Sequence, residues 1–127
     1  MKLDPRYRKL ILSFFLILSI VLVFAFFDYL AHQYDTEYSV PSRYFPNKII
    51  FGSMFGFFIF LLLGKQNPLE KSLIFSFTVS VFLQIRYFLE GYPKDFVFLF
   101  LGVHFVLLFL VSYAFFWILK WKKIQLV

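Results

Sequence analysis

Six side chains in this sequence have the chemistry to bind a proton, an ion or a polar ligand inside a membrane. Depth along each apolar run, at about 1.5 Å per residue from its middle, places His104 and Gln84 about 5 Å from the midplane. Arg86 lies about 8 Å out, and Asp28 and Glu90 about 14 Å out, all toward the same side. Ionisable groups at such depth face protein or water, so the sequence predicts a polar pocket that opens outward. Its candidate residues are Asp28, His32, Gln84, Arg86, Glu90 and His104.

Ion pairing is the first reading of this set. Glu90 follows Arg86 by four residues, which puts both on one helical face. Asp28, on the first apolar run, is the other acid within reach. We therefore expect an Asp28–Arg86–Glu90 cluster with His104 beneath it. Such a network can be purely structural, because structural ion pairs also place charges at unusual depth.

Metal binding is the second reading. Asp28 and His32 are four residues apart and share a helical face, and carboxylate with imidazole suits zinc, iron or manganese. No cofactor is expected, and a metal ion on Asp28 and His32 is the alternative that the sequence leaves open. Haem would need both His32 and His104, whose expected depths differ by more than two turns, so haem is disfavoured.

Proton or ion transport is the third reading, since a buried histidine with acids can relay protons. The inner half of the runs carries no polar group stronger than serine, which leaves a through-path incomplete. Hydrolase chemistry is the weakest reading, because neither a nucleophile elbow nor a Walker motif is present.

The elements that must position these residues are membrane helices. Of the 127 residues, 61% are hydrophobic and only 16% charged, against about 25% charged in a soluble domain. Long, non-alternating apolar runs cross a membrane as helices. We predict an all-α integral membrane protein, an antiparallel bundle of four transmembrane helices in one domain covering residues 1–127. The expected helices are about 10–30, 49–63, 70–90 and 94–119, with an outer loop at 31–48.

The helix ends carry sequence signals as well. Asn67, Pro68 and Glu70 form a capping-box pattern that predicts a helix start. Gly64 and Gly91 are placed to end the second and third helices. Lys48 and Lys65 flank the shortest run and are expected to lengthen it by extending their stems toward the headgroups.

Lysine and arginine predict the orientation, because cytoplasmic loops carry the excess. Nine lie on one side and four on the other, which places both termini in the cytoplasm of a multi-pass cell-membrane protein. The charge therefore signals orientation, and no nucleic acid partner is expected. The larger group is Lys2, Arg6, Arg8, Lys9, Lys65, Lys71, Lys120, Lys122 and Lys123, and the smaller is Arg43, Lys48, Arg86 and Lys94.

Small residues point to helix contacts. Gly52 and Gly56 form a GxxxG motif, and Ser76 and Ser80 lie on one face of the third predicted helix; both patterns favour close packing of membrane helices. The leading prediction is a non-enzymatic protein that acts by association, as a homo-oligomer or an accessory subunit, with the lipid bilayer and other membrane subunits as partners. The alternative is a metal- or proton-dependent membrane enzyme or transporter built on the outer pocket.

Overall fold

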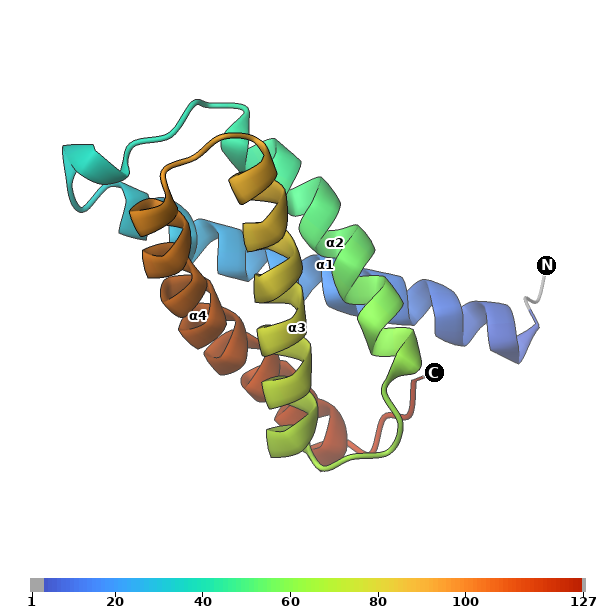
Figure 1. Ribbon diagram of the computed structural model, residues 1–127. Coiled ribbons are helices and arrows are strands. Elements are labelled where there is room, and N and C mark those ends of the chain that lie inside the picture. Colours follow the sequence, from blue (N-terminus) through green and yellow to red (C-terminus); the bar gives the residue numbers. More distant parts are fainter. Residues whose placement is uncertain (1–3, 127) are drawn as a thin grey trace.

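The computed structural model describes residues 4–126 and is all α-helical apart from its loops (Figure 1). Four of its helices are long and apolar enough to cross a membrane, as the sequence predicted. Loops 33–43 and 90–93 lie at one end of the helices, which we call the site end, and loop 63–67 lies at the other. The elements are α1 (Pro5–His32), a 3-10 turn (Thr36–Tyr38), α2 (Tyr44–Leu62), α3 (Pro68–Leu89) and α4 (Lys94–Trp121). Lys2, one of the charges used to predict orientation, is outside the described residues.

Local sequence signals explain most helix ends. The Asn67 side chain accepts a hydrogen bond of 2.8 Å from the backbone N–H of Glu70, and Pro68 opens α3, which confirms the predicted cap. Gly91 has a φ of +94°, the left-handed conformation that glycine adopts readily after a helix. Gly64 does not have this role: α2 stops at Leu62, and extended backbone at Leu63 ends the helix.

Replacing Asn67 by alanine should lower the free energy of unfolding by about 0.5–2 kcal/mol, the usual cost of losing an N-cap. Asn67→Asp is the matched control, because aspartate keeps the capping oxygen. Thermal unfolding in detergent, followed by circular dichroism, measures both variants. An equal loss of stability in Asn67→Ala and Asn67→Asp would show that the capping hydrogen bond does not stabilise α3.

The second helix begins five residues before the predicted start. Pro46 is compatible with this start, since the first-turn N–H groups of a helix have no intrahelical partner. The predicted outer loop 31–48 is therefore reduced to 33–43, and Lys48 becomes part of α2. The prediction that Lys48 extends its stem to the headgroups is wrong, because this side chain is fully buried.

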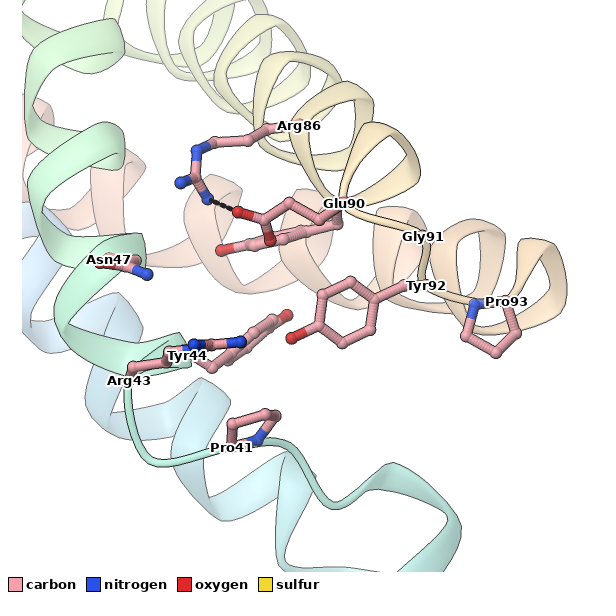
Figure 2. Close-up of a pocket in the computed structure, with 10 residues that line it drawn as sticks. Pro41, Arg43, Tyr44, Asn47, Arg86, Glu90, Gly91, Tyr92 and Pro93 are labelled. Atoms are coloured by element: carbon pink, nitrogen blue, oxygen red, sulfur yellow. Dashed lines mark ion pairs between the residues drawn. The ribbon is translucent and has the colours of Figure 1, made fainter.

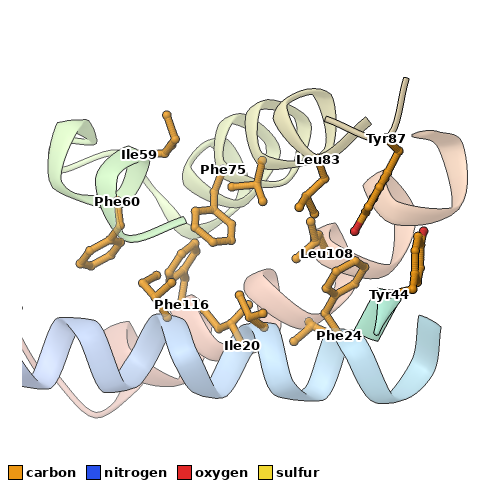
Figure 3. Close-up of a cluster of buried hydrophobic side chains, with 14 of the residues drawn as sticks. Ile20, Phe24, Tyr44, Ile59, Phe60, Phe75, Leu83, Tyr87, Leu108 and Phe116 are labelled. Atoms are coloured by element: carbon orange, nitrogen blue, oxygen red, sulfur yellow. The ribbon is translucent and has the colours of Figure 1, made fainter. Parts of the chain in front are cut away.

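The core is filled by apolar side chains from all four helices (Figure 3). Gly52 and Gly56 lie against α1, where a Cβ on Gly56 would stand 3.0 Å from Ile17 Cγ2. Ser76 and Ser80 are fully buried along α3. These small residues thus allow close packing within the chain. The labelled core residues are Ile20, Phe24, Tyr44, Ile59, Phe60, Phe75, Leu83, Tyr87, Leu108 and Phe116.

Candidate functional site

A buried acid–base cluster lies near the site end, centred on the carboxylate of Asp28. Three bases surround it: His32 one turn later on α1, Lys48 on α2, and His104 on α4. Asp28, Lys48 and His104 have no exposed surface, and His32 is 1% exposed. The cluster therefore joins three helices through charged and polar groups that water does not reach.

Lys48 is the resident cation of the cluster. Its ammonium pairs with Asp28 Oδ2, lies 2.9 Å from His104 Nε2, and sits over the Tyr44 ring at 4.0 Å from the centroid. An ammonium has three donors, and these three neighbours can use all of them. A buried charge needs such a set of partners to offset its lost hydration.

His32 is held by a backbone carbonyl. Its Nδ1 is 2.7 Å from the carbonyl oxygen of Tyr38, and a carbonyl can only accept, so Nδ1 carries the proton. In the neutral ring Nε2 is then a lone-pair acceptor, yet it faces Asp28 Oδ2 at 3.3 Å. Two acceptors at this distance repel each other unless a proton or a cation lies between them. The ring cannot easily turn away, because it stacks on Phe100 at 4.2 Å and 2°.

His104 has a related conflict. Its Nε2 is 2.9 Å from the Lys48 ammonium, a donor, and 3.0 Å from Asp28 Oδ1, an acceptor. A neutral ring matches one of these two contacts, and Nδ1 finds no hydrogen-bond partner within residues 4–126. The protons of the cluster can therefore be distributed over these side chains in more than one arrangement.

Two tyrosines close the cluster on one side. The rings of Tyr44 and Tyr87 stack with centroids 4.7 Å apart, and Lys48 Nζ lies within 5.6 Å of the Tyr87 centroid. Tyr44 and Tyr87 are 2% and 1% exposed. Their other edges line a cleft at the site end, so the pair separates the cleft from the buried charges.

That cleft has a volume of about 480 Å³ and lies between α2 and the α3–α4 turn (Figure 2). Arg86 pairs with Glu90 at 2.6 Å and stacks over Phe51 at 3.8 Å. Burial of part of the Tyr92 ring, with Glu90 nearby, raises the pKa of its phenol, which keeps the hydroxyl protonated. The other lining residues are Pro41, Arg43, Tyr44, Asn47, Tyr87, Gly91 and Pro93.

The six predicted pocket residues are thus divided between separate places. Asp28, His32 and His104 meet in the cluster, whereas Arg86 and Glu90 form their predicted pair in the cleft. The predicted Asp28–Arg86–Glu90 network is wrong, because the ion-pair partners of Asp28 are the three bases. Gln84 belongs to neither site and donates a 2.6 Å hydrogen bond to the Val97 carbonyl.

Lys48 is the site residue that sequence reasoning missed. The sequence signal was the length of the apolar run that follows Lys48. This run, 49–63, has only 15 residues, whereas about 17–25 are needed to cross a bilayer. A helix of sufficient length must take in residues before Ile49, which puts Lys48 inside it. A lysine inside a membrane helix then needs a buried acid as its partner.

The chemistry open to the cluster is proton exchange or metal coordination. Asp28, His32 and His104 each offer one ligand atom, and these atoms lie within 4.8 Å of one another. Lys48 already supplies a positive charge at the same carboxylate. Neither a family model, nor a curated protein, nor a solved structure matches the chain.

Proposed function

We propose that this protein is a proton-dependent membrane transporter, with the Asp28–His32–Lys48–His104 cluster as its proton-binding site. The observation that carries the proposal is the contact between His32 Nε2 and Asp28 Oδ2, where two acceptors face each other at 3.3 Å. One proton placed on His32 or on Asp28 turns this repulsion into a hydrogen bond. Histidine is the side chain best suited to exchange a proton near neutral pH.

Protonation would be coupled to helix packing. Asp28 links α1 to Lys48 on α2 and to His104 on α4. A proton that binds to Asp28 neutralises its charge and weakens both links, because an ion pair loses its attraction when one partner becomes neutral. A proton that arrives can therefore bias the relative placement of three helices, which is the requirement for coupling proton uptake to a conformational change.

The proposed setting is a cell membrane, with the four helices antiparallel, both termini cytoplasmic and the site end outside. The excess of Lys and Arg on the opposite side supports this orientation. Burial of Lys48 strengthens the asymmetry, since it leaves Arg43, Arg86 and Lys94 as the site-end cations. In this orientation the outer solution would be the source of the protons, which would have to pass the Tyr44–Tyr87 pair to reach the buried cluster.

Asp28→Asn should abolish proton uptake by the protein. The measurement adds a step of acid to the purified protein in weakly buffered detergent solution that contains a pH-sensitive dye; wild-type protein should take up more protons than Asp28→Asn does. Asp95→Asn is the control, because it makes the same chemical change at an exposed position near the same end. Equal proton uptake by wild type and Asp28→Asn would contradict the proposal.

A transition metal is the second candidate occupant, favoured by the three converging ligand atoms. Two histidines and one carboxylate suit zinc or iron, and the Tyr38 carbonyl is the kind of partner that orients a metal-binding histidine. Elemental analysis of the purified protein separates the two candidates. If the wild-type protein contains stoichiometric metal and His104→Ala does not, the cluster is a metal site and not a proton site.

Association with further copies or other membrane subunits stays a prediction. The glycines and serines that motivated it are used for packing inside the chain. Packing does not, by contrast, explain the buried charges of the cluster, since apolar side chains would fill the same space. For this reason we place the proton-dependent function ahead of association.

A further inference from the structure

The cleft at the site end contains buried hydroxyl groups that the chain leaves unsatisfied. Tyr44 and Tyr87 are almost fully buried, and neither phenolic oxygen has a hydrogen-bond partner among the described residues. Buried tyrosine hydroxyls nearly always find a partner. Both residues line the cleft, so a molecule in the cleft is a ready source of that partner.

The charges around the cleft favour an anion. Arg43, at the start of α2, and Arg86, on α3, stand on facing walls, and Glu90 is the single acid (Figure 2). Glu90 takes one edge of the Arg86 guanidinium, which leaves further N–H donors on a group that has five. The lining therefore carries a net positive charge together with donor groups.

The donors come from several directions. Figure 2 shows the Tyr92 hydroxyl and the Arg86 guanidinium extending into the cleft from the α3–α4 side. Arg43, which directly precedes α2, and Asn47 on α2 lie opposite them. Guanidinium groups bind phosphate oxygens through paired, charge-assisted hydrogen bonds. Phenolic hydroxyls can complete the shell of a tetrahedral group, whose oxygens point in four directions.

We propose that this cleft binds a phosphate ester. Its volume of about 480 Å³ exceeds the needs of the phosphate group itself and is in the usual range for ligand sites, about 300–1,000 Å³. The ester can come from a soluble molecule or from a phospholipid headgroup, since the cleft lies at the helix ends, where headgroups are expected. The proposal rests on the cleft's own contacts and goes beyond the proton site.

The test is isothermal titration of the full chain, purified in a detergent that contains no phosphate. The probes are glycerol 3-phosphate, a short-chain phosphatidylglycerol, and the dicarboxylate succinate. We expect saturable binding of at least one phosphate probe, weakened at least about tenfold by Arg43→Gln, since a hydrogen bond to a charged group contributes that much or more. Arg8→Gln, at the opposite end of α1 and exposed, is the matched control.

Tyr87→Phe provides a second variant in which the ring stack, and hence the fold, is kept. It should also weaken phosphate binding while its unfolding transition stays that of wild type. Binding of phosphatidylglycerol without glycerol 3-phosphate would assign the site to a lipid headgroup, and the reverse would assign it to a soluble ester. Binding of succinate alone, no binding of either phosphate probe, or affinity unchanged in both variants would overturn the proposal.

Discussion

Replacing Lys48 by methionine should destabilise the protein by about 3–5 kcal/mol, the cost of leaving a buried charge without its partner. Methionine keeps the unbranched stem and removes the ammonium, so packing changes little. Asp28 would then face two histidines with no fixed positive charge beside it. Unfolding in mixed micelles of increasing denaturing detergent, followed by circular dichroism, measures the loss.

Two further variants make this result specific. In Asp28→Asn/Lys48→Met both formal charges are gone, and more than half of the lost stability should return. Lys65→Met removes an exposed lysine at the other end of α2 and should change stability by less than about 0.5 kcal/mol. A Lys48→Met protein as stable as the Lys65→Met protein would show that the buried pair does not hold the helices together.

Replacing Gly56 by leucine should cost about 3 kcal/mol or more, because there is no space for a side chain where α2 meets α1. A Cβ alone would come within 3.0 Å of Ile17 Cγ2 and 3.3 Å of Phe75 Cζ. Overpacking of this kind typically costs about 1–3 kcal/mol even for small insertions. The same micelle titration measures the effect.

Gly102→Leu is the matched control for Gly56→Leu. It makes the same change within a long helix, but a Cβ there meets nothing within 4 Å. The loss of stability in Gly52→Ala should lie between those of Gly56→Leu and Gly102→Leu, since its Cβ would stand 3.3 Å from Val21 Cγ1. Equal tolerance of leucine at 56 and 102 would refute close α1–α2 contact.

The features that could be predicted from the sequence are local ones. The Asn67 cap, the left-handed Gly91 and the Arg86–Glu90 pair each involve residues within four positions of one another. Helix geometry alone brings such residues together, so their spacing is sufficient evidence. The four apolar helices were equally predictable, because uninterrupted hydrophobicity over this length is typical of segments that cross a bilayer.

Contacts between helices could not be predicted in the same way. Depth was measured from the middle of each apolar run, which assumes upright, centred helices. α1 and α4 have 28 residues each, or about 42 Å of length, more than the roughly 30 Å of hydrocarbon. Helices this long tilt or protrude, and their midpoints need not coincide. His32 and His104 were therefore expected more than two turns apart, although both contact Asp28.

The hydrogen bond between His32 and the Tyr38 carbonyl also connects a surface turn to the buried cluster. Thr36–Tyr38 is a short turn outside the four long helices, and it selects which imidazole nitrogen bears hydrogen. An antibody or partner that pulled this turn outward would remove the acceptor that holds the proton on Nδ1, so the other tautomer of the ring would become accessible while its stack on Phe100 remains. The acid–base state of the buried charges is thus open to control by a binding event that never reaches them.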